Sequence, residues 1–301
     1  MCGLAAMTAI AAGQTPAQTP PQTPPTSNTQ TQTPFRASAQ TVAVYATVLD
    51  RDGRLVTNLT RADFDVLDNG KPVPLTVFSN DIQPITVAIM LDTSDSMDRK
   101  FTRVRESTQS FIDQLLPADR ARIGTFGEEV AISPLLTGDK TVLSRVLREE
   151  MWPGGGTPLW SAIDAAMTAL STEEGRRVIL TLTDGQNACV ELRGPCKQSD
   201  PVAARAVDEE FMVYAIGMEG TGLDRTVKAL ADRTGGGAFE LPQSANLTAA
   251  FARVADELHH QYALGFRAAV LDGQVHTIDV RIKKPALTAR ARKSYVARPE
   301  R

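Results

Sequence analysis

The feature that most constrains the fold is an apolar run that ends abruptly in a polar loop. Residues 85–91 read Ile-Thr-Val-Ala-Ile-Met-Leu, with Thr86 as the only polar residue and no alternation of polar and apolar positions. Strands that are covered on both faces, as in a parallel sheet flanked by helices, have this pattern. The next residues, Asp92-Thr93-Ser94-Asp95-Ser96, are all polar. In an open α/β sheet such a loop lies at the carboxyl ends of the strands, where ligands bind.

This polar loop offers oxygen ligands for a hard cation. Asp92, Ser94 and Ser96 stand at alternate positions, so one carboxylate and two hydroxyls can converge. Ligands of this kind suit Mg²⁺ or Mn²⁺ and not a soft metal. Taken alone the pattern is weak, because Ser and Asp favour loops for backbone reasons as well.

Two later stretches add further oxygen ligands. The first is Gly154-Gly155-Gly156-Thr157, which places a threonine hydroxyl on a glycine-rich loop ahead of a helical pattern. The second is Arg177-Val-Ile-Leu-Thr-Leu-Thr183, a buried strand that ends in Asp184-Gly185. The second aspartate thus also follows a strand. The three loops together predict an octahedral oxygen site.

With these motifs in this order, the chain resembles the von Willebrand factor type A (VWA) family over about residues 85–261. The metal-ion-dependent adhesion site of that family uses Asp-x-Ser-x-Ser, a distant Thr and a distant Asp. The resemblance implies that the metal-site residues are Asp92, Ser94, Ser96, Thr157 and Asp184. It implies that the hydroxyls touch the ion directly and that the carboxylates act partly through water. The implied ion is Mg²⁺ or Mn²⁺, with Ca²⁺ as a further candidate, and the implied ligand is an exposed Asp or Glu of a protein partner.

One position departs from the family pattern. The residue between the two serines is often Gly in the family, and here it is Asp95. Aspartate tolerates unusual loop conformations better than most residues, so the fold is not threatened. A third carboxylate that pointed toward the ion would, however, repel the carboxylate of a partner.

The amino-terminal residues read as an export signal and a tether. We expect residues 1–13 to be a signal peptide, because a short apolar stretch, too short to span a bilayer, carries small residues at Ala9 and Ala11. A retained anchor is the alternative. Residues 14–35 form a Thr/Pro/Gln tract that we expect to be a disordered linker. The sequence therefore predicts a secreted, periplasmic or cell-envelope protein with no transmembrane span in its mature chain.

Two of the three cysteines lie close together after the second aspartate. Cys2 falls within the expected signal, whereas Cys189 and Cys196 flank a short polar stretch. In an oxidising compartment we expect this pair to form a disulfide bond. Unpaired surface thiols are the alternative, and a zinc site lacks two further ligands nearby.

The remaining patterns define the domain organisation. Residues 36–84 and 262–301 show the two-residue period of β-strands, with a hairpin signal at Asn69-Gly70. Residues 85–261 alternate strands with helices and form the expected VWA domain. The expected strands are 41–49, 64–68, 73–78, 85–91, 122–126, 130–132, 177–183, 211–216, 238–241, 262–270, 275–282 and 287–296, and the expected helices are 101–116, 141–151, 159–170, 202–210, 223–234 and 247–261.

These patterns predict an α/β fold with a doubly wound, mostly parallel sheet of the VWA or Rossmann-like kind. Each terminal β segment is too short to fold alone. We therefore expect a smaller, β-sandwich-like domain built from both chain ends.

Composition narrows the function. The net charge of −3 mixes both signs, which disfavours nucleic acid as a partner. No nucleophile elbow, phosphate-binding loop or zinc-protease motif is present, so we expect no enzyme. Three hypotheses stay open at this point: a protein-binding module that uses the ion, a structural protein in which the ion only pins loops, and a metal-assisted hydrolase. The sequence does not indicate an oligomeric state.

Overall fold

The computed structural model describes residues 1, 41–149, 154–190, 193–218, 222–242 and 246–299. The expected signal peptide, apart from Met1, and the expected linker lie outside these residues. The chain divides into two units, Met1–Thr33 and Pro34–Arg301, and every element below belongs to the second.

The described residues form a central sheet of six strands in the order β10-β9-β8-β5-β6-β7. All neighbouring pairs are parallel except β6 with the edge strand β7. The strands are β5 (Thr86–Asp92), β6 (Arg120–Phe126), β7 (Val130–Ile132), β8 (Arg177–Thr183), β9 (Met212–Gly217) and β10 (Ala238–Glu240). The chain leaves β5 toward β6 on one side and leaves β8 toward β9 on the other. The order therefore reverses between β5 and β8, which is where open α/β sheets form their ligand crevice.

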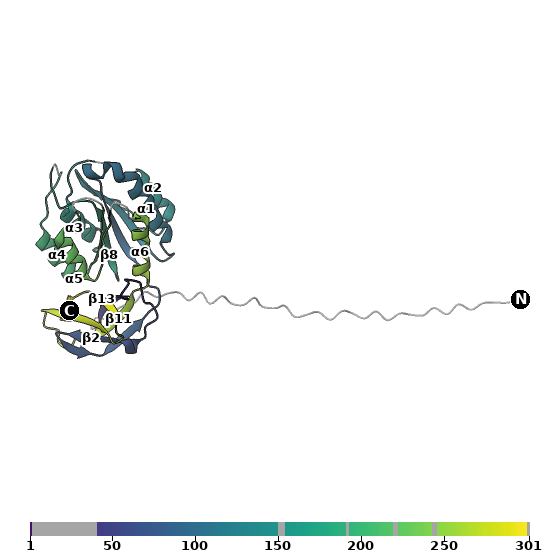
Figure 1. The fold of residues 1–301 in the computed structure, drawn as a ribbon, viewed down its shortest axis with the longest axis vertical. Helices are drawn as coiled ribbons and strands as arrows, with labels where there is room; N and C mark the ends of the chain where they lie inside the picture. Colours follow the sequence, from purple (N-terminus) through teal and green to yellow (C-terminus); the bar gives the residue numbers. More distant parts are fainter. Residues whose placement is uncertain (2–40, 150–153, 191–192, 219–221, 243–245, 300–301) are drawn as a thin grey trace. The chain divides into compact units, whose positions relative to one another are not determined.

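Helices cover both faces of this sheet. Figure 1 shows α1, α2 and α6 on one side and α3, α4 and α5 on the other. The helices are α1 (Phe101–Gln114), α2 (Lys140–Glu149), α3 (Leu159–Ala169), α4 (Ser199–Asp208), α5 (Arg225–Thr234) and α6 (Leu247–His259). Because both faces are covered, β5 carries apolar side chains at successive positions, as its sequence predicted. The doubly wound α/β fold is confirmed.

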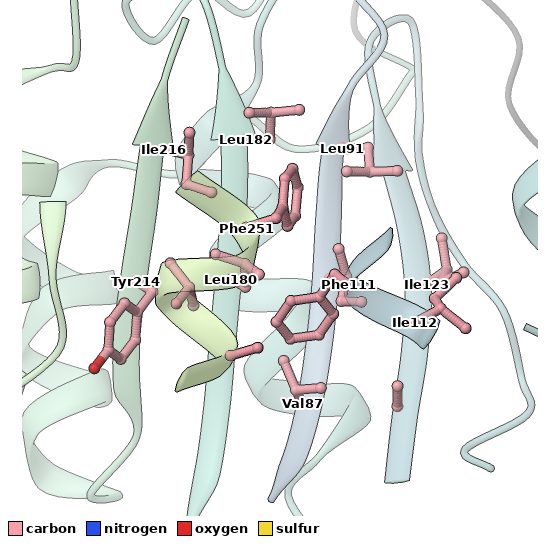
Figure 2. Packing of buried hydrophobic residues seen from close by; sticks show 14 of the residues in the cluster. Val87, Leu91, Phe111, Ile112, Ile123, Leu180, Leu182, Tyr214, Ile216 and Phe251 are labelled. Carbon is pink, nitrogen blue, oxygen red and sulfur yellow. The ribbon is translucent and has the colours of Figure 1, made fainter. Parts of the chain in front are cut away.

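Aromatic packing anchors one of these two faces. Figure 2 shows Phe111 of α1 and Phe251 of α6 over the sheet, between Val87 and Leu91 of β5 and neighbouring strand residues. The two phenylalanine rings lie 5.9 Å apart in an edge-to-face arrangement. Alternate residues of β5, Ala88 and Met90, pack into the opposite core instead. Side chains of β5 thus pack into the cores on both faces of the sheet. This packing holds the end of β5 in place, and with it the start of the loop that follows Asp92.

The two chain ends together form a β-sandwich. One sheet has the order β13-β1-β11-β4 and the other β14-β12-β2-β3. Its strands are β1 (Thr41–Leu49), β2 (Phe64–Asp68), β3 (Lys71–Val73), β4 (Leu75–Ser79), β11 (Tyr262–Arg267), β12 (Val275–Ile282), β13 (Thr288–Arg290) and β14 (Ser294–Val296). In each sheet a strand from the amino-terminal segment pairs with one from the carboxyl-terminal segment, β1 with β11 and β2 with β12. A shared core includes Phe64, Tyr262 and Phe266.

Two strands and two 3₁₀ helices differ from the sequence prediction. The strand expected over residues 73–78 is divided, since β3 pairs with β2 whereas β4 pairs with β11 in the other sheet. Pro74 lies at the division and has no N–H to donate to a sheet ladder. The strand expected over residues 287–296 is likewise divided into β13 and β14, which belong to different sheets. A 3₁₀ helix, η2 (Asp95–Lys100), replaces the expected loop after Ser94, and a second one, η1 (Arg61–Asp63), precedes β2.

A buried polar network joins the sandwich to the α/β domain. The Arg176 guanidinium donates to the side-chain oxygen of Gln261 at 2.7 Å, and the side-chain amide of Gln261 donates to the Thr47 hydroxyl of β1 at 3.0 Å. The fully buried Glu257 of α6 forms an ion pair with Arg290 of β13. The polar groups of this network have hydrogen-bond or ion-pair partners and are shielded from water. Buried polar groups stabilise a junction when they are satisfied in this way.

None of the helices in the described ranges combines the length and apolarity needed to span a bilayer.

Candidate metal centre

The first predicted loop is organised by a buried carboxylate. Asp92, the last residue of β5, has no exposed surface. Its Oδ1 accepts a hydrogen bond from the backbone N–H of Ser94 at 2.9 Å, and its Oδ2 accepts one from the Thr183 hydroxyl at 2.5 Å. Burial raises the pKa of Asp92 to about 6, and nearby Asp184 adds to the rise, while the hydrogen bonds from Ser94 and Thr183 oppose it. Asp92 therefore holds the loop after β5 against the end of β8.

The two serines and the second aspartate form a continuous hydrogen-bonded cluster. Ser94 Oγ lies 3.2 Å from Ser96 Oγ, and the Ser96 hydroxyl donates to Asp184 Oδ1 at 2.8 Å. The ammonium group of Lys100 forms an ion pair with the other oxygen, Asp184 Oδ2. The Asp184 and Lys100 side chains are only 3% and 18% exposed, so this pair is largely shielded from water. A cationic group thus already contacts a predicted metal ligand.

The Thr157 loop packs directly against this cluster. Thr157 is 6% exposed, and its backbone exchanges hydrogen bonds of 2.7 and 2.8 Å with that of Ala188. Its Oγ1 lies 3.6 Å from where a Cβ on Gly185 would stand, next to Asp184. The structure therefore brings all five predicted residues to the reversal point of the sheet.

Asp95 links the first two loops. Its Oδ1 accepts the N–H of Gly155 at 3.2 Å, and its own N–H donates to the carbonyl of Gly155 at 3.2 Å. Gly155 has φ +84°, and a Cβ there would come within 2.5 Å of the Glu128 backbone nitrogen. Only glycine fits both conditions. The family departure at Asp95 thus has a structural role in tying the glycine loop to the serine loop.

The cysteine pair lies in a segment that is attached to the Thr157 loop. Cys189 and Cys196 form a disulfide bond, so this prediction is confirmed. The bond begins one residue after Ala188, the backbone partner of Thr157. Further along, the Ser161 hydroxyl at the start of α3 donates to the carbonyl of Pro195 at 3.0 Å. The disulfide therefore closes a loop that supports Thr157 from outside.

The residues of this cluster fit a hard divalent cation. Three hydroxyls and two carboxylates are oxygen donors, the kind that Mg²⁺, Mn²⁺ and Ca²⁺ take. The Lys100 ammonium on Asp184 shows that positive charge is favoured there, and a bound cation would replace it. Among the described residues, no group of three or more His, Cys, Asp or Glu side chains is arranged so that it could hold a metal ion by itself. Hydroxyl oxygens must therefore complete any coordination shell at this site.

Two residues of the cluster were not identified from the sequence. Thr183 ends β8 just before Asp184, and its hydroxyl faces Asp92. Lys100 lies four positions after Ser96, and η2 turns it back toward Asp184. Thr183 carried a signal, as the polar end of an apolar strand. Lys100 did not, because a loop was expected where η2 forms.

Comparison with known families agrees with this geometry. A family model described as the von Willebrand factor type A domain matches residues 86–253. Because this is more than half of the 301 residues, the chain belongs to the von Willebrand factor type A domain family.

Solved structures show the same fold. A von Willebrand factor type A protein from Catenulispora acidiphila aligns with a TM-score of 0.50 and 14% identity, over 87% of this chain and 75% of that one. Proximal thread matrix protein 1 from the mussel byssus aligns with a TM-score of 0.51 and 18% identity, over 62% of this chain and 48% of that one. That structure has a zinc-occupied metal-ion-dependent adhesion site motif. At these identities the likeness concerns the fold alone. No curated protein sequence matches the chain.

Proposed function

We propose that this chain is a protein-binding module that engages a partner through a divalent cation held by Asp92, Ser94, Ser96, Thr157 and Asp184. Mg²⁺ or Mn²⁺ is the proposed ion, with Ca²⁺ as a further candidate. The ion would supply a coordination position for an exposed Asp or Glu carboxylate of the partner. The observation that carries this proposal is the convergence of the Ser94–Ser96–Asp184 cluster with the Thr157 loop.

Charge and geometry favour an anionic partner. Three neutral hydroxyls leave a dication poorly neutralised, and Asp92 is turned toward Ser94 N–H and Thr183. A carboxylate from outside would supply both an oxygen ligand and the missing negative charge. Asp95 Oδ1 accepts the N–H of Gly155, so this side chain is tied to the glycine loop.

A purely structural ion is the weaker alternative. The loops that such an ion would pin are already joined by protein contacts, namely Ser96 with Asp184, Asp95 with Gly155 and Thr157 with Ala188. An ion at this site therefore has little left to hold together. The role that remains for the ion is to bind a partner outside the chain.

A hydrolase would need a base near the ion, and none of the three histidines lies in this cluster. His259 is bonded to Asp119, at 2.7 Å, and His276 to Asp68, at 2.9 Å, in the sandwich. His260 contacts Asp256 on its own helix. All three histidines therefore have structural partners away from the metal centre, and we propose no enzymatic activity.

The proposed location is outside the cytoplasm, in the envelope or secreted. Disulfide bonds persist mainly in oxidising compartments, and Cys189–Cys196 is such a bond. The expected export signal and linker agree with this location.

The test compares Thr157→Ala with Thr141→Ala, an exposed threonine at the start of α2. A partner captured from the native envelope in Mg²⁺ should be released by EDTA and should bind Thr157→Ala weakly, with circular dichroism unchanged. Thr141→Ala should bind as the parent does. Capture that is indifferent both to EDTA and to Thr157→Ala would mean that the site is structural.

A further inference from the structure

A second site lies at the opposite edge of the central sheet. A cleft of about 910 Å³ is lined by the first residues of four parallel strands, Thr86, Arg120, Arg177 and Met212. The β-sandwich supplies its other wall, which includes Tyr45 of β1. Clefts of this volume at the junction of two domains are the usual place for small-molecule ligands.

The cleft is lined by more arginine than acid. Its cationic side chains are Arg120, Arg176, Arg177, Arg233 and Arg292, and its acidic ones are Glu173, Glu174 and Glu210. Among the described residues, no lysine, aspartate or histidine lines the cleft. The cleft therefore carries excess positive charge on side chains that present planar, forked N–H donors.

Two of these arginines are neutralised within the cleft. Arg120 Nη1 lies 2.7 Å from Glu173 Oε2, and Arg292 Nη1 lies 2.8 Å from Glu210 Oε1. Arg176 is held by carbonyls and Gln261 at the domain junction. The excess charge therefore resides on the remaining members of the set.

Arg177 and Arg233 form no ion pair with any carboxylate of the described residues. The Arg177 guanidinium donates to the backbone carbonyl of Glu209 and lies over the Phe211 ring at 4.2 Å. Burial lowers the pKa of Arg177, while the charges of Glu209 and Glu210 act in the opposite direction. Arg233, on α5, is exposed at the cleft.

Arg292 has two N–H donor nitrogens that form no hydrogen bond with the described residues. Its Nη1 is occupied by Glu210, but its Nε and Nη2 are buried and have no hydrogen-bond partner among the described residues. These two N–H groups lie on one edge of the guanidinium plane, the edge that pairs with two oxygens of a carboxylate or phosphate. Other arginines, among them Arg122 and Arg290, also have a buried Nε without a partner, but only Arg292 has two such nitrogens among the described residues.

We propose that this cleft binds a small oxyanion, a phosphate- or carboxylate-bearing molecule, through Arg177, Arg233 and Arg292. Two of these residues belong to the α/β domain and Arg292 belongs to the segment between β13 and β14. A ligand held by all three bridges the domain junction. The cleft is larger than an inorganic phosphate ion. We therefore expect the natural ligand to have further atoms that contact the uncharged walls of the cleft. This site is independent of the metal centre.

The test uses the full chain, freed of metal on a chelating resin, because a soluble chelator is itself a polycarboxylate. Inorganic phosphate, pyrophosphate and citrate are titrated separately by calorimetry. We expect saturable binding of at least one probe, with roughly a tenfold loss of affinity for each arginine removed in Arg177→Gln and Arg233→Gln. Pyrophosphate binding more tightly than citrate assigns the ligand to the phosphate class, and the reverse order assigns it to the carboxylates.

Matched variants separate recognition from folding. Arg281→Gln, on the 64% exposed Arg281 side chain of β12, should bind the probes as the parent does. Glu210→Gln should tighten binding severalfold, because it removes the carboxylate that competes for Arg292. The proposal is overturned if no probe binds up to roughly 10 mM, an affinity too weak to be specific. It is also overturned if Arg177→Gln, Arg233→Gln and Glu210→Gln all bind like Arg281→Gln.

Discussion

The two edges of the central sheet differ in charge and in how their polar groups are satisfied. At the carboxyl edge, Asp92 and Asp184 are buried and each has protein partners, including the Lys100 ammonium. At the amino edge, arginines line an open cleft, and Arg292 keeps two buried N–H groups without acceptors. One edge is a compact cluster of acids and hydroxyls, and the other is a basic cleft. The proposed cation site and the proposed anion site thus lie at opposite ends of the strands of one sheet.

This difference shows what each edge requires from its surroundings. The carboxyl edge is internally closed, so a cation must displace an existing partner, the lysine, to bind. At the amino edge Arg120 and Arg292 are paired with Glu173 and Glu210, whereas no carboxylate of the described residues forms an ion pair with Arg177 or Arg233. An anion can therefore bind these two arginines without displacing a protein carboxylate.

The largest expected effect is a change of stability with pH that arises from Asp92 at the carboxyl edge. The pKa of Asp92 is raised from 3.8 to about 6 by burial, so between these values the folded state holds a proton that the unfolded state has lost. This contribution to stability is fully present below pH 3.8 and is lost as pH rises through about 6. In metal-free protein the free energy of unfolding should fall with rising pH, on the order of 3 kcal/mol more than in Asp92→Asn. Urea denaturation from pH 4 to pH 7 measures this, and parallel pH curves for the two proteins would refute it.

The next effect is the loss of metal binding. Asp184→Ala removes a ligand of the proposed ion and the acceptor of Ser96, so the affinity for Mn²⁺ should fall roughly a hundredfold. Asp98→Ala is the matched control. Asp98 is an exposed acid on η2, the helix that also carries Ser96, and it lies outside the cluster. Calorimetric titration of both variants checks the prediction. Equal affinities for Asp184→Ala and Asp98→Ala would exclude Asp184 from the site.

A smaller effect is expected from the disulfide. Replacing both Cys189 and Cys196 by Ser should lower the free energy of unfolding by about 2.5 kcal/mol, the loop-closure entropy of so short a loop. Because Ala188 supports Thr157, the same variant should also bind Mn²⁺ severalfold more weakly. The amino edge should be unaffected, and hydrogen exchange of its amides provides the control. Unchanged Mn²⁺ affinity would show that the disulfide loop does not position Thr157.

The smallest effect concerns Lys100. Because its ammonium occupies Asp184, Lys100→Gln should raise the affinity for Mn²⁺ roughly fivefold, the equivalent of an ion pair of about 1 kcal/mol. Arg99→Gln removes the same charge from the exposed neighbouring residue and should change the affinity much less. If the two variants raise the affinity equally, net charge and not the Lys100–Asp184 contact is responsible.

The sequence allowed the carboxyl edge to be predicted because its residues follow strands directly. Asp92 ends one apolar run and Asp184 follows another, so strand order alone places them together. Lys100 was missed because its approach to Asp184 depends on η2, where the polar residues indicated a loop. Pro74 shows a second limit: a proline divides β3 from β4, and the pattern of apolar residues does not reveal that the chain changes sheets there.

The amino edge could not be predicted from the sequence at all. Arg177, Arg233 and Arg292 are far apart in the chain and stand in unrelated local patterns. They meet only because the sandwich, built from both chain ends, closes against the first residues of the strands. Tertiary packing, and not any local motif, creates this cleft.

The most direct test of the account is to locate a bound ion on the molecule. Mn²⁺ broadens the amide resonances of nearby residues, and a ¹⁵N-labelled sample reports each amide separately. If the ion binds at the carboxyl edge, we expect selective broadening of the amide resonances of Ser94, Ser96, Thr157 and Gly185. The amide resonances of Arg177 and Arg233, at the opposite edge, should be unaffected. Broadening centred elsewhere, or the same broadening in Asp184→Ala, would contradict a metal centre at the carboxyl edge of the sheet.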